Sequence, residues 1–243
     1  MPIFYTPTLN SSSKEITISD TEFKHIKNTL RKKIGDILNL TNGNGLLAEC
    51  IIKELSPREI ILQIERIDKK EKSHPHIALA FSLLKQHNEL IIEKCTELGI
   101  YEFFPFFAER NVKTSLSTHQ FERLEKVAIA ALKQCDSTHL PQIHKPLAFG
   151  ELLKNLSQNY YPILAWEEED RHGLHEVLEN SEKDICLIVG PEGGFEKSEV
   201  DLARQYSAQI ISLGNHILRA ETAAITIVAN TIFYQLEKDP EFY

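Results

Sequence analysis

Two glycine-containing loops carry the residues best suited to chemistry. The first, Gly190–Ser198, follows the apolar run Ile185–Val189 and precedes a helical pattern. A phosphate-binding loop is disfavoured, because Phe195 stands where a glycine is needed and because Glu192 and Glu196 would repel a triphosphate. Its adjacent glycines instead bring backbone N–H and C=O groups close to a ligand that carries both charges or none. A tight turn without a ligand is the alternative for this loop taken alone.

The second loop, Gly214–Thr222, follows the next apolar run, Ile210–Leu213. The pair Ile217-Leu218 is apolar where solvent would favour polar side chains, which indicates that these residues grip a flat ring. Arg219 and Glu221 flank the start of the following helix. An acid suits the positive end of a helix dipole and an arginine does not, so Arg219 is predicted to be a functional cation.

Three other motifs resemble binding sites only in outline. Gly43-x-Gly45-x-x-Ala48 fits the dinucleotide fingerprint formally, but no convincing helix follows, so we expect a hairpin turn. His74-x-His76 and His172-x-x-His175 have spacings that suit a metal, but the sequence suggests no carboxylate or thiol partner. We expect surface histidines and no metal site.

The elements that position the two loops alternate between short apolar runs and longer amphipathic stretches. This rhythm predicts an α/β domain in which helices cover both faces of a parallel sheet, with ligands at the carboxyl ends of the strands. The expected strands are Ile77–Leu83, Phe103–Phe107, Ile163–Trp166, Ile185–Val189 and Ile210–Leu213, and the expected helices are Glu89–Leu98, Phe121–Lys133, Ser198–Tyr206 and Thr222–Leu236.

The first part of the chain has a different, β-rich pattern. Strands are predicted at Ile16–Ser19, Asp36–Thr41, Leu46–Leu55 and Ile60–Ile67, with a basic helix around Phe23, Ile26 and Leu30. A small β-barrel or sandwich fits this pattern. The charged run at 68–75 ends in a proline and is the expected linker, so we expect one domain at residues 1–70 and a second at 76–243.

Composition excludes several classes of protein. The 243 residues are 42% hydrophobic, enough for a large core, and the formal charge of −8 argues against non-specific coating of nucleic acid. Residues 1–76 carry 12 Lys and Arg against 10 Asp and Glu, so we expect any contact with an anionic polymer in this segment. No apolar run approaches the ~20 residues of a membrane span, and no signal peptide is evident. Widely spaced Cys50, Cys95, Cys135 and Cys186 indicate reduced thiols, and we expect a cytoplasmic protein.

The two loops resemble the hallmark motifs of a known family. Gly190-Pro-Glu-Gly-Gly-Phe and Leu213-Gly-Asn-His-Ile-Leu-Arg-Ala-Glu-Thr-Ala are similar to those of the methyltransferases that modify a uridine at N3 in 16S ribosomal RNA of the small subunit, members of the knotted SPOUT class that use S-adenosylmethionine. Further similarity extends over nearly the whole chain, at His25-Ile26, Leu30-Arg31, Gly35-Asp36, Gly43-x-Gly45, Leu84-Lys85, Ile91-Ile92-x-Lys94-x-Thr96-Glu97-Leu98-Gly99 and Glu109-Arg110.

The resemblance implies an architecture and partners. It implies an N-terminal PUA-like β-barrel that binds RNA and a C-terminal α/β domain tied in a trefoil knot, a rare exception to the connection rules. The expected partners are 16S ribosomal RNA, in the assembled small subunit, and a second copy of the chain. The apolar face of the last helix, with Ile225, Val228, Ile232 and Leu236, is a candidate dimer contact, with ordinary core as the alternative.

The resemblance also implies roles for particular residues. Arg219 is the expected cation beside the developing uracil anion, and Glu221 or Glu192 is the expected base or orienting group, unless these carboxylates cap a helix or hold Arg219. The expected cofactor contacts are Leu164, Trp166, Gly190, Gly194, Leu213, Gly214, Ile217 and Leu218. The expected RNA contacts are Arg31, Lys32, Lys85 and Arg110, each with a solvated surface charge as the alternative.

Two departures from the family pattern keep other functions open. Ile3 and Ser137 stand where the family usually has arginines that would contact RNA. A non-catalytic RNA-binding relic on the same fold is therefore one alternative. A methyltransferase of the same class that acts on another RNA position is the other, although a ribose hydroxyl would need a stronger base than this pocket offers.

Overall fold

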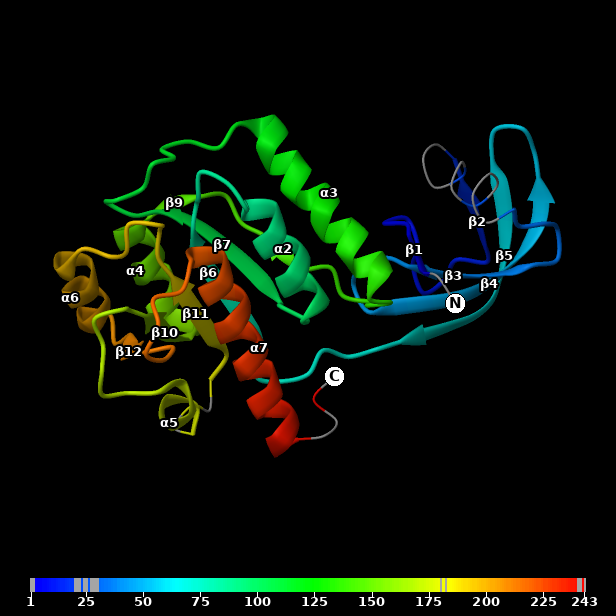
Figure 1. Ribbon diagram of the computed structural model, residues 1–243. Helices are drawn as coiled ribbons and strands as arrows, with labels where there is room; N and C mark the ends of the chain where they lie inside the picture. Colours follow the sequence, from blue (N-terminus) through cyan, green and yellow to red (C-terminus); the bar gives the residue numbers. More distant parts are fainter. Residues whose placement is uncertain are drawn as a thin grey trace. The chain divides into compact units, whose positions relative to one another are not determined.

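The structure of the chain, a computed structural model, describes residues 3–19, 23, 26, 31–179, 181, 183–239 and 242. It separates into two units (Figure 1). The first comprises Met1–Lys72 with Ile129–Leu140, and the second comprises Ser73–Ala128 with Pro141–Tyr243. Most of the predicted basic helix, including Lys24, Lys27 and Leu30, lies outside the described residues.

The strands of the first unit form one curled sheet in the order β1-β3-β4-β5-β2. Alternate side chains, such as Leu38 and Leu40 or Ile60 and Leu62, are fully buried, as expected for a sheet with one face on a core. Two register shifts between β4 and β5 bend the ladder. The predicted β-rich domain is confirmed, as an open half-barrel in its described strands. The bounds are β1 Ile3–Tyr5, β2 Glu15–Ile18, β3 Ile37–Thr41, β4 Leu46–Leu55 and β5 Ile60–Lys69.

The glycine turn between β3 and β4 is a hairpin connection, as predicted. Gly43 and Gly45 have φ of 73° and 84°, conformations that favour glycine. Residues of the segment Ile129–Leu140, which belongs to the same unit, contact this turn. The Gly45 N–H donates to the Thr138 carbonyl at 2.9 Å. A Cβ on Gly45 would lie 2.5 Å from the Lys70 carbonyl oxygen. Both glycines are therefore explained by a tight turn and close packing, without a dinucleotide.

The second unit is built on a parallel sheet in the order β12-β10-β11-β6-β7-β8, with β9 also paired to β7. Every residue of β6 and β11 is buried, which is typical of a parallel sheet covered on both faces. The predicted α/β architecture is confirmed. The bounds are β6 Ile77–Ser82, β7 Glu102–Phe107, β8 Gln142–Ile143, β9 Leu147–Ala148, β10 Tyr161–Ala165, β11 Ile185–Val189 and β12 Gln209–Ile211.

Helices cover both faces of this sheet (Figure 1). α4 and α6 pack together on one side, and α7 packs with α2 and α5 on the other. On α7, Val228 and Ile232 belong to the core of the unit, so only part of the predicted dimer face is available. Phe233, which the prediction omitted, is 62% exposed. The bounds are α2 Asn88–Glu97, α3 Thr118–Gln134, α4 Phe149–Asn159, α5 Leu174–Leu178, α6 Lys197–Gln205 and α7 Ala220–Lys238.

None of the four cysteines, all of which lie in the described part of the chain, forms a disulfide. Burial raises the pKa of the Cys50 thiol to about 12, and it also raises the pKa values of Cys95 and Cys186. These buried thiols are therefore poor nucleophiles at neutral pH. Within the described residues, no helix has the length and apolar character needed to cross a membrane.

Candidate active site

A cavity of about 660 Å³ opens where the strands of the second unit end. Its walls come from the loops that follow β11 and β12, which flank β10 in the sheet, and from the residues that follow β10 and β6. The carboxyl ends of parallel strands meet at one edge of a sheet, which is where α/β proteins bind ligands. Two loops that were recognised separately in the sequence therefore line one cavity.

The first loop folds tightly over an aromatic ring. Phe195 is 3% exposed, and in the core its ring stacks on Phe106 and packs at a tilt against Phe149. A Cβ on Gly190 would lie 2.8 Å from the Phe195 ring, so a larger residue does not fit there. Gly194 has φ of 70° and its N–H donates to the Pro191 carbonyl at 3.0 Å. Gly190 thus lets the loop backbone lie close to the ring beneath it, whereas a Cβ on Gly194 would meet the Glu167 carboxylate.

Charged residues hold this loop in place. The Glu192 carboxylate accepts a hydrogen bond from the Lys85 backbone N–H at 2.9 Å. The Arg110 guanidinium donates to the Gly193 carbonyl at 3.0 Å and pairs with Glu196 at 2.6 Å. This hydrogen bond to Glu196 raises the pKa of Arg110. Glu196 also begins α6 in a capping box with Glu199.

The second loop leaves its polar groups uncommitted. Arg219 occupies the N-cap position of α7 without making a side-chain cap, and Glu221 lies in the first helical turn. Both line the cavity, and no hydrogen bond or ion pair joins either side chain to another described residue. Ile217 is 87% exposed. Gly214, with φ of 120°, provides the turn after β12.

Trp166, which follows β10, contributes an unsatisfied donor. Its backbone N–H donates to the Ile211 carbonyl at 2.9 Å, which fixes it beside β12. Trp166 lines the cavity, but its ring packs against the buried core beneath the Arg204 guanidinium, and its buried indole N–H has no acceptor among the described residues.

The structure brings most of the predicted site residues together. Of the predicted cofactor contacts, the cavity is lined by Trp166, Gly190, Gly194, Leu213, Gly214, Ile217 and Leu218; the three predicted catalytic residues, Arg219, Glu221 and Glu192, also line it. Leu164 does not line it, because this side chain is fully buried in the core and its neighbour Ala165 takes that place. Sequence reasoning missed Gln86 and His87, although the carboxyl end of β6 was a signal for them.

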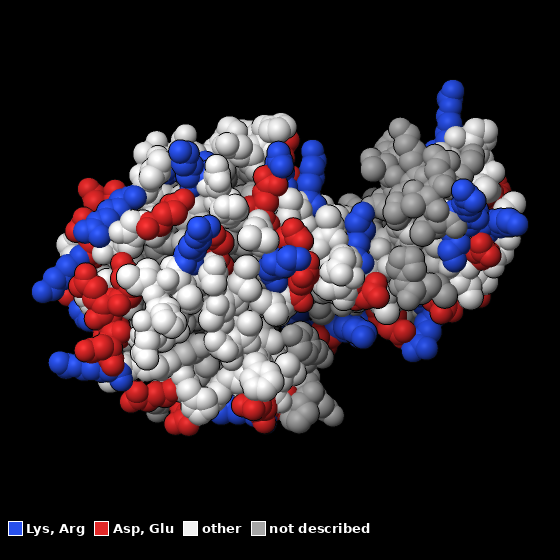
Figure 2. All heavy atoms as spheres, viewed as in Figure 1, with Lys and Arg blue, Asp and Glu red and all other residues white. Residues whose placement is uncertain are grey.

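The predicted RNA contacts are dispersed. Lys85 lines the cavity, whereas Arg110 lies against the first loop. In the first unit Arg31 is exposed, and the Lys32 ammonium donates to the Ile37 carbonyl at 3.2 Å. On the face drawn in Figure 2, basic and acidic side chains of the second unit are interspersed. This distribution suits contacts at particular positions better than a coating of nucleic acid.

Ile3 and Ser137, which stand where the family usually has arginines, both make contacts within the first unit. Ile3 is 4% exposed and belongs to the buried residues of β1. The Ser137 hydroxyl accepts a hydrogen bond from the His139 backbone N–H at 3.2 Å.

The histidine pairs differ from their prediction in one respect. His172 and His175 are exposed and lie beside Glu176 and Glu179. His76, expected at the surface, has only 16% of its side chain exposed, and it has a carboxylate partner in Asp184. The sequence did not suggest this partner, because it lies 108 residues away.

Comparisons with known proteins place this chain among RNA methyltransferases. Residues 70–232 match the family model described as an RNA methyltransferase domain, and residues 18–65 match the one described as an RNA methyltransferase PUA domain. The ribosomal RNA small subunit methyltransferase E of Rickettsia conorii is 32% identical over 229 residues, which cover 93% of each chain. That of Bacillus subtilis is 29% identical over 232 residues, 91% of this chain and 90% of the other.

Solved structures show the same fold over nearly the whole chain. A probable rRNA-methyltransferase from Porphyromonas gingivalis has a TM-score of 0.88 and 26% identity, covering 98% of this chain and 100% of the other. A ribosomal RNA small subunit methyltransferase E from Neisseria gonorrhoeae, bound to S-adenosyl methionine, has a TM-score of 0.84 and 23% identity, covering 95% and 96%. The PUA-like and SPOUT architecture is therefore confirmed, and the chain belongs to the ribosomal RNA small subunit methyltransferase E family.

Proposed function

We propose that this protein transfers the methyl group of S-adenosylmethionine to N3 of a uridine in 16S ribosomal RNA. Family membership supports the reaction class. The observation that carries the proposal is that two glycine loops, which follow two strands that are not neighbours in the sheet, line one cavity and place Arg219 and Glu221 in it.

The residues of the cavity fit the cofactor. Ile217, which is 87% exposed, and the half-buried Leu218 offer apolar packing for an adenine ring. The carboxylates of Glu167 and Glu192 line the same cavity and suit the positive charge of a sulfonium. When bound, the cofactor supplies an electrophilic methyl group. The backbone of Gly190 and Gly194 would hold it close to the first loop.

The protein must also lower the free-energy cost of removing the N3 proton of uracil. The N3 proton of uracil has a pKa about two units above neutral, so its removal costs roughly 3 kcal/mol. The Arg219 guanidinium, which has no counter-ion among the described residues, would stabilise the developing negative charge on a uracil oxygen. Glu221 is the better candidate base, because Glu192 already accepts a hydrogen bond from Lys85.

The remaining parts of the proposal concern binding. Residues 1–70, as a PUA-like domain, would contact RNA through Arg31 and Lys32, and residues 76–243 would form the methyltransferase domain with Lys85 at its RNA entrance. Arg110 would support RNA binding through the first loop. We further propose that the protein acts as a homodimer on the assembled small subunit, in the cytoplasm.

Replacement of the proposed cation tests the mechanism. We expect Arg219→Ala to lower turnover by about 10²–10³, because a preorganised charge that stabilises the transition state is lost. Binding of S-adenosylmethionine, measured by calorimetry, should change by no more than a few-fold. Arg171→Ala is a matched control, since Arg171 is 83% exposed and does not line this cavity. Normal methylation by Arg219→Ala would refute the assignment.

Two measurements separate this function from its alternatives. Wild-type protein that binds no S-adenosylmethionine would indicate an RNA-binding relic. Mass spectrometry of ribosomal RNA nucleosides from cells with and without the protein should show loss of 3-methyluridine. Loss of another methylated nucleoside instead would indicate another target position.

A further inference from the structure

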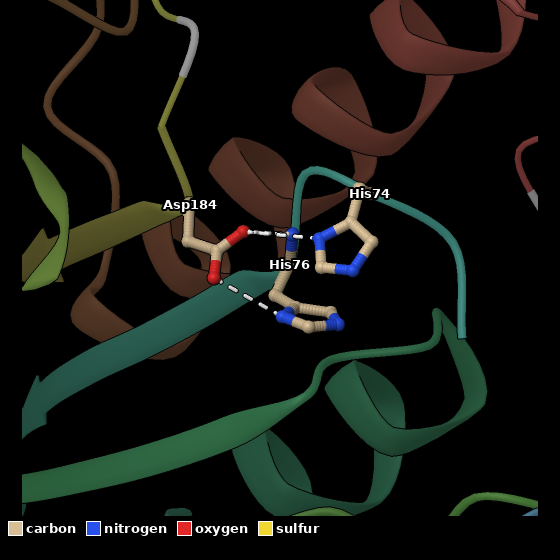
Figure 3. A group of neighbouring side chains, drawn as sticks. All are labelled: His74, His76 and Asp184. Atoms are coloured by element: carbon tan, nitrogen blue, oxygen red, sulfur yellow. Dashed lines mark hydrogen bonds and ion pairs between the residues drawn. The ribbon is translucent and has the colours of Figure 1, made fainter. Parts of the chain in front are cut away.

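A second cluster of chemically competent side chains lies at the amino ends of the same strands (Figure 3). His76 directly precedes β6, and Asp184 directly precedes β11, the neighbouring strand. His74 lies two residues before His76, at the start of the second unit. The cavity described above is at the carboxyl ends of these strands, so the cluster is a separate place in the molecule.

The three side chains converge on one carboxylate. His76 Nδ1 lies 3.1 Å from one oxygen of Asp184, and His74 Nδ1 lies 3.6 Å from the other. One donor atom from each residue lies within 4.8 Å of the other two. Figure 3 shows both imidazole rings facing the Asp184 carboxylate from the same segment of chain.

Two of the three side chains are held by the sheet itself. The His76 backbone N–H donates to the Asp184 carboxylate at 2.8 Å, and the Ile185 N–H donates to the His76 carbonyl at 2.8 Å. The His76 ring also stacks on Tyr101, with centroids 4.0 Å apart and an interplanar angle of 16°. His74 is different, since 70% of its side chain is exposed. The site therefore combines a rigid pair with one adjustable ligand.

We propose that His74, His76 and Asp184 bind a divalent transition-metal ion of the zinc class. Two imidazole nitrogens and one carboxylate oxygen form a ligand set typical of zinc, with water in the fourth position, whereas magnesium and calcium prefer oxygen ligands. Zinc bonds of 2.0–2.1 Å place neighbouring ligands about 3.3 Å apart in a tetrahedron. The 3.1 and 3.6 Å separations run to different oxygens of Asp184, and the three donor atoms lie within 4.8 Å of one another, so metal binding requires the exposed His74 ring to move toward the oxygen that His76 faces.

Bound metal would join the segment that enters the second unit to the start of β11. Its role would be structural, because the cluster lies away from the cavity that holds Arg219 and Glu221. The pair His172 and His175 has no comparable arrangement, since His74, His76 and Asp184 are the one group of three such ligands within metal-binding reach among the described residues. The proposal does not depend on the proposed methyltransferase activity.

The test is zinc binding by the full chain. Competition between the metal-free protein and a chromophoric chelator for Zn²⁺ should show one equivalent bound, with its affinity lowered at least tenfold in His74→Ala. His74 is the position to replace, because it is exposed and its loss does not disturb the sheet; Asp184→Asn would also remove bonds that hold β11. His172→Ala is the matched control, as another exposed histidine beside a carboxylate, and it should bind zinc like the wild type.

Two further measurements test whether the zinc binds at this cluster and not elsewhere on the protein. Zn²⁺ should shift the imidazole NMR signals of His74 and His76 selectively, and it should raise the unfolding temperature of the wild type more than that of His74→Ala. Equal zinc affinity in the wild type and His74→Ala would overturn the proposal, and so would absence of stoichiometric binding. The cluster would then be a hydrogen-bonded tie between β6 and β11.

Discussion

Gly190 illustrates how a single position in the cavity is constrained by the core beneath it. In Gly190→Ala the new methyl group would meet the Phe195 ring, which is fixed between other buried rings and cannot move aside. We expect a loss of about 1–3 kcal/mol in the free energy of unfolding, as for other overpacked sites, and a weaker affinity for S-adenosylmethionine. Denaturant unfolding and calorimetry measure the two effects.

Gly173→Ala is the control for this substitution. Gly173 has φ of −93°, and a Cβ there would meet nothing within 4 Å. This variant should keep its stability and its cofactor affinity. If Gly190→Ala also keeps its stability and its cofactor affinity, the first loop can accommodate a methyl group at this position and the predicted clash with Phe195 is wrong.

Residue types predicted the cavity well but not every side chain in it. Arg219 was predicted because an arginine is out of place at a helix start, and it lines the cavity. Leu164 was predicted and does not line it, because neighbouring residues of a strand point to opposite faces and the sequence does not reveal which of Leu164 and Ala165 faces the ligand. Asp184 was missed as a partner of His76, since only strand order brings them together.

Among the elements, the loop before α6 depends on an ion pair from another part of the unit. Arg110 donates to the Gly193 carbonyl and to Glu196, the first residue of the capping box. Both side chains of the pair are more than a third exposed, so its contribution is modest. We expect Arg110→Ala to weaken S-adenosylmethionine binding between about two- and tenfold, measured by calorimetry without RNA.

This measurement separates two roles for Arg110. Arg123→Ala removes another exposed pair, Arg123 with Glu89, and should leave cofactor binding unchanged. If Arg110→Ala instead binds the cofactor like the wild type but loses RNA affinity, Arg110 contacts RNA directly and does not support the loop.

Strongly patterned elements were predictable, including the short strand β12, whereas β8, β9 and α4 were missed. β4 was predicted with the bounds that it has, and α2, α3, α6 and α7 lie within a few residues of their predicted positions. β8 and β9 have two residues each, too few for a period to emerge. α4 was also missed, although its buried face of Leu152, Leu153 and Leu156 follows helical spacing.

At the scale of the whole molecule, the two parts of the chain were predicted from a change in rhythm near residue 70. That change does not show that Ile129–Leu140 belongs with the first unit. Backbone bonds from Gly43 and Gly45 to residues 138–140 account for this grouping, and such contacts between distant segments leave no local pattern. The trefoil knot likewise comes from the family resemblance alone, because no periodicity predicts the threading of a chain.

The surface of α7 leads to the last prediction, which concerns the proposed homodimer. Phe233 is 62% exposed, and Ile225, Ala229 and Leu236 are partly exposed near it at helical spacing. Figure 2 shows a largely uncharged surface over this helix. Large exposed aromatic residues in such patches often dominate association. We expect the wild type to sediment as a dimer and Phe233→Glu to weaken dimerisation at least about 30-fold, since a hot-spot residue contributes 2 kcal/mol or more.

Val112→Glu is the matched control, because Val112 is also apolar, 67% exposed and in the second unit, but lies outside α7. It should remain dimeric, and both variants should keep the wild-type unfolding temperature when diluted to monomers. A monomeric wild type at micromolar concentration, or a Phe233→Glu variant that sediments as a dimer, would show that α7 is not the contact. A glutamate buried in this apolar contact would have no partner, so the substitution tests whether Phe233 lies in the interface.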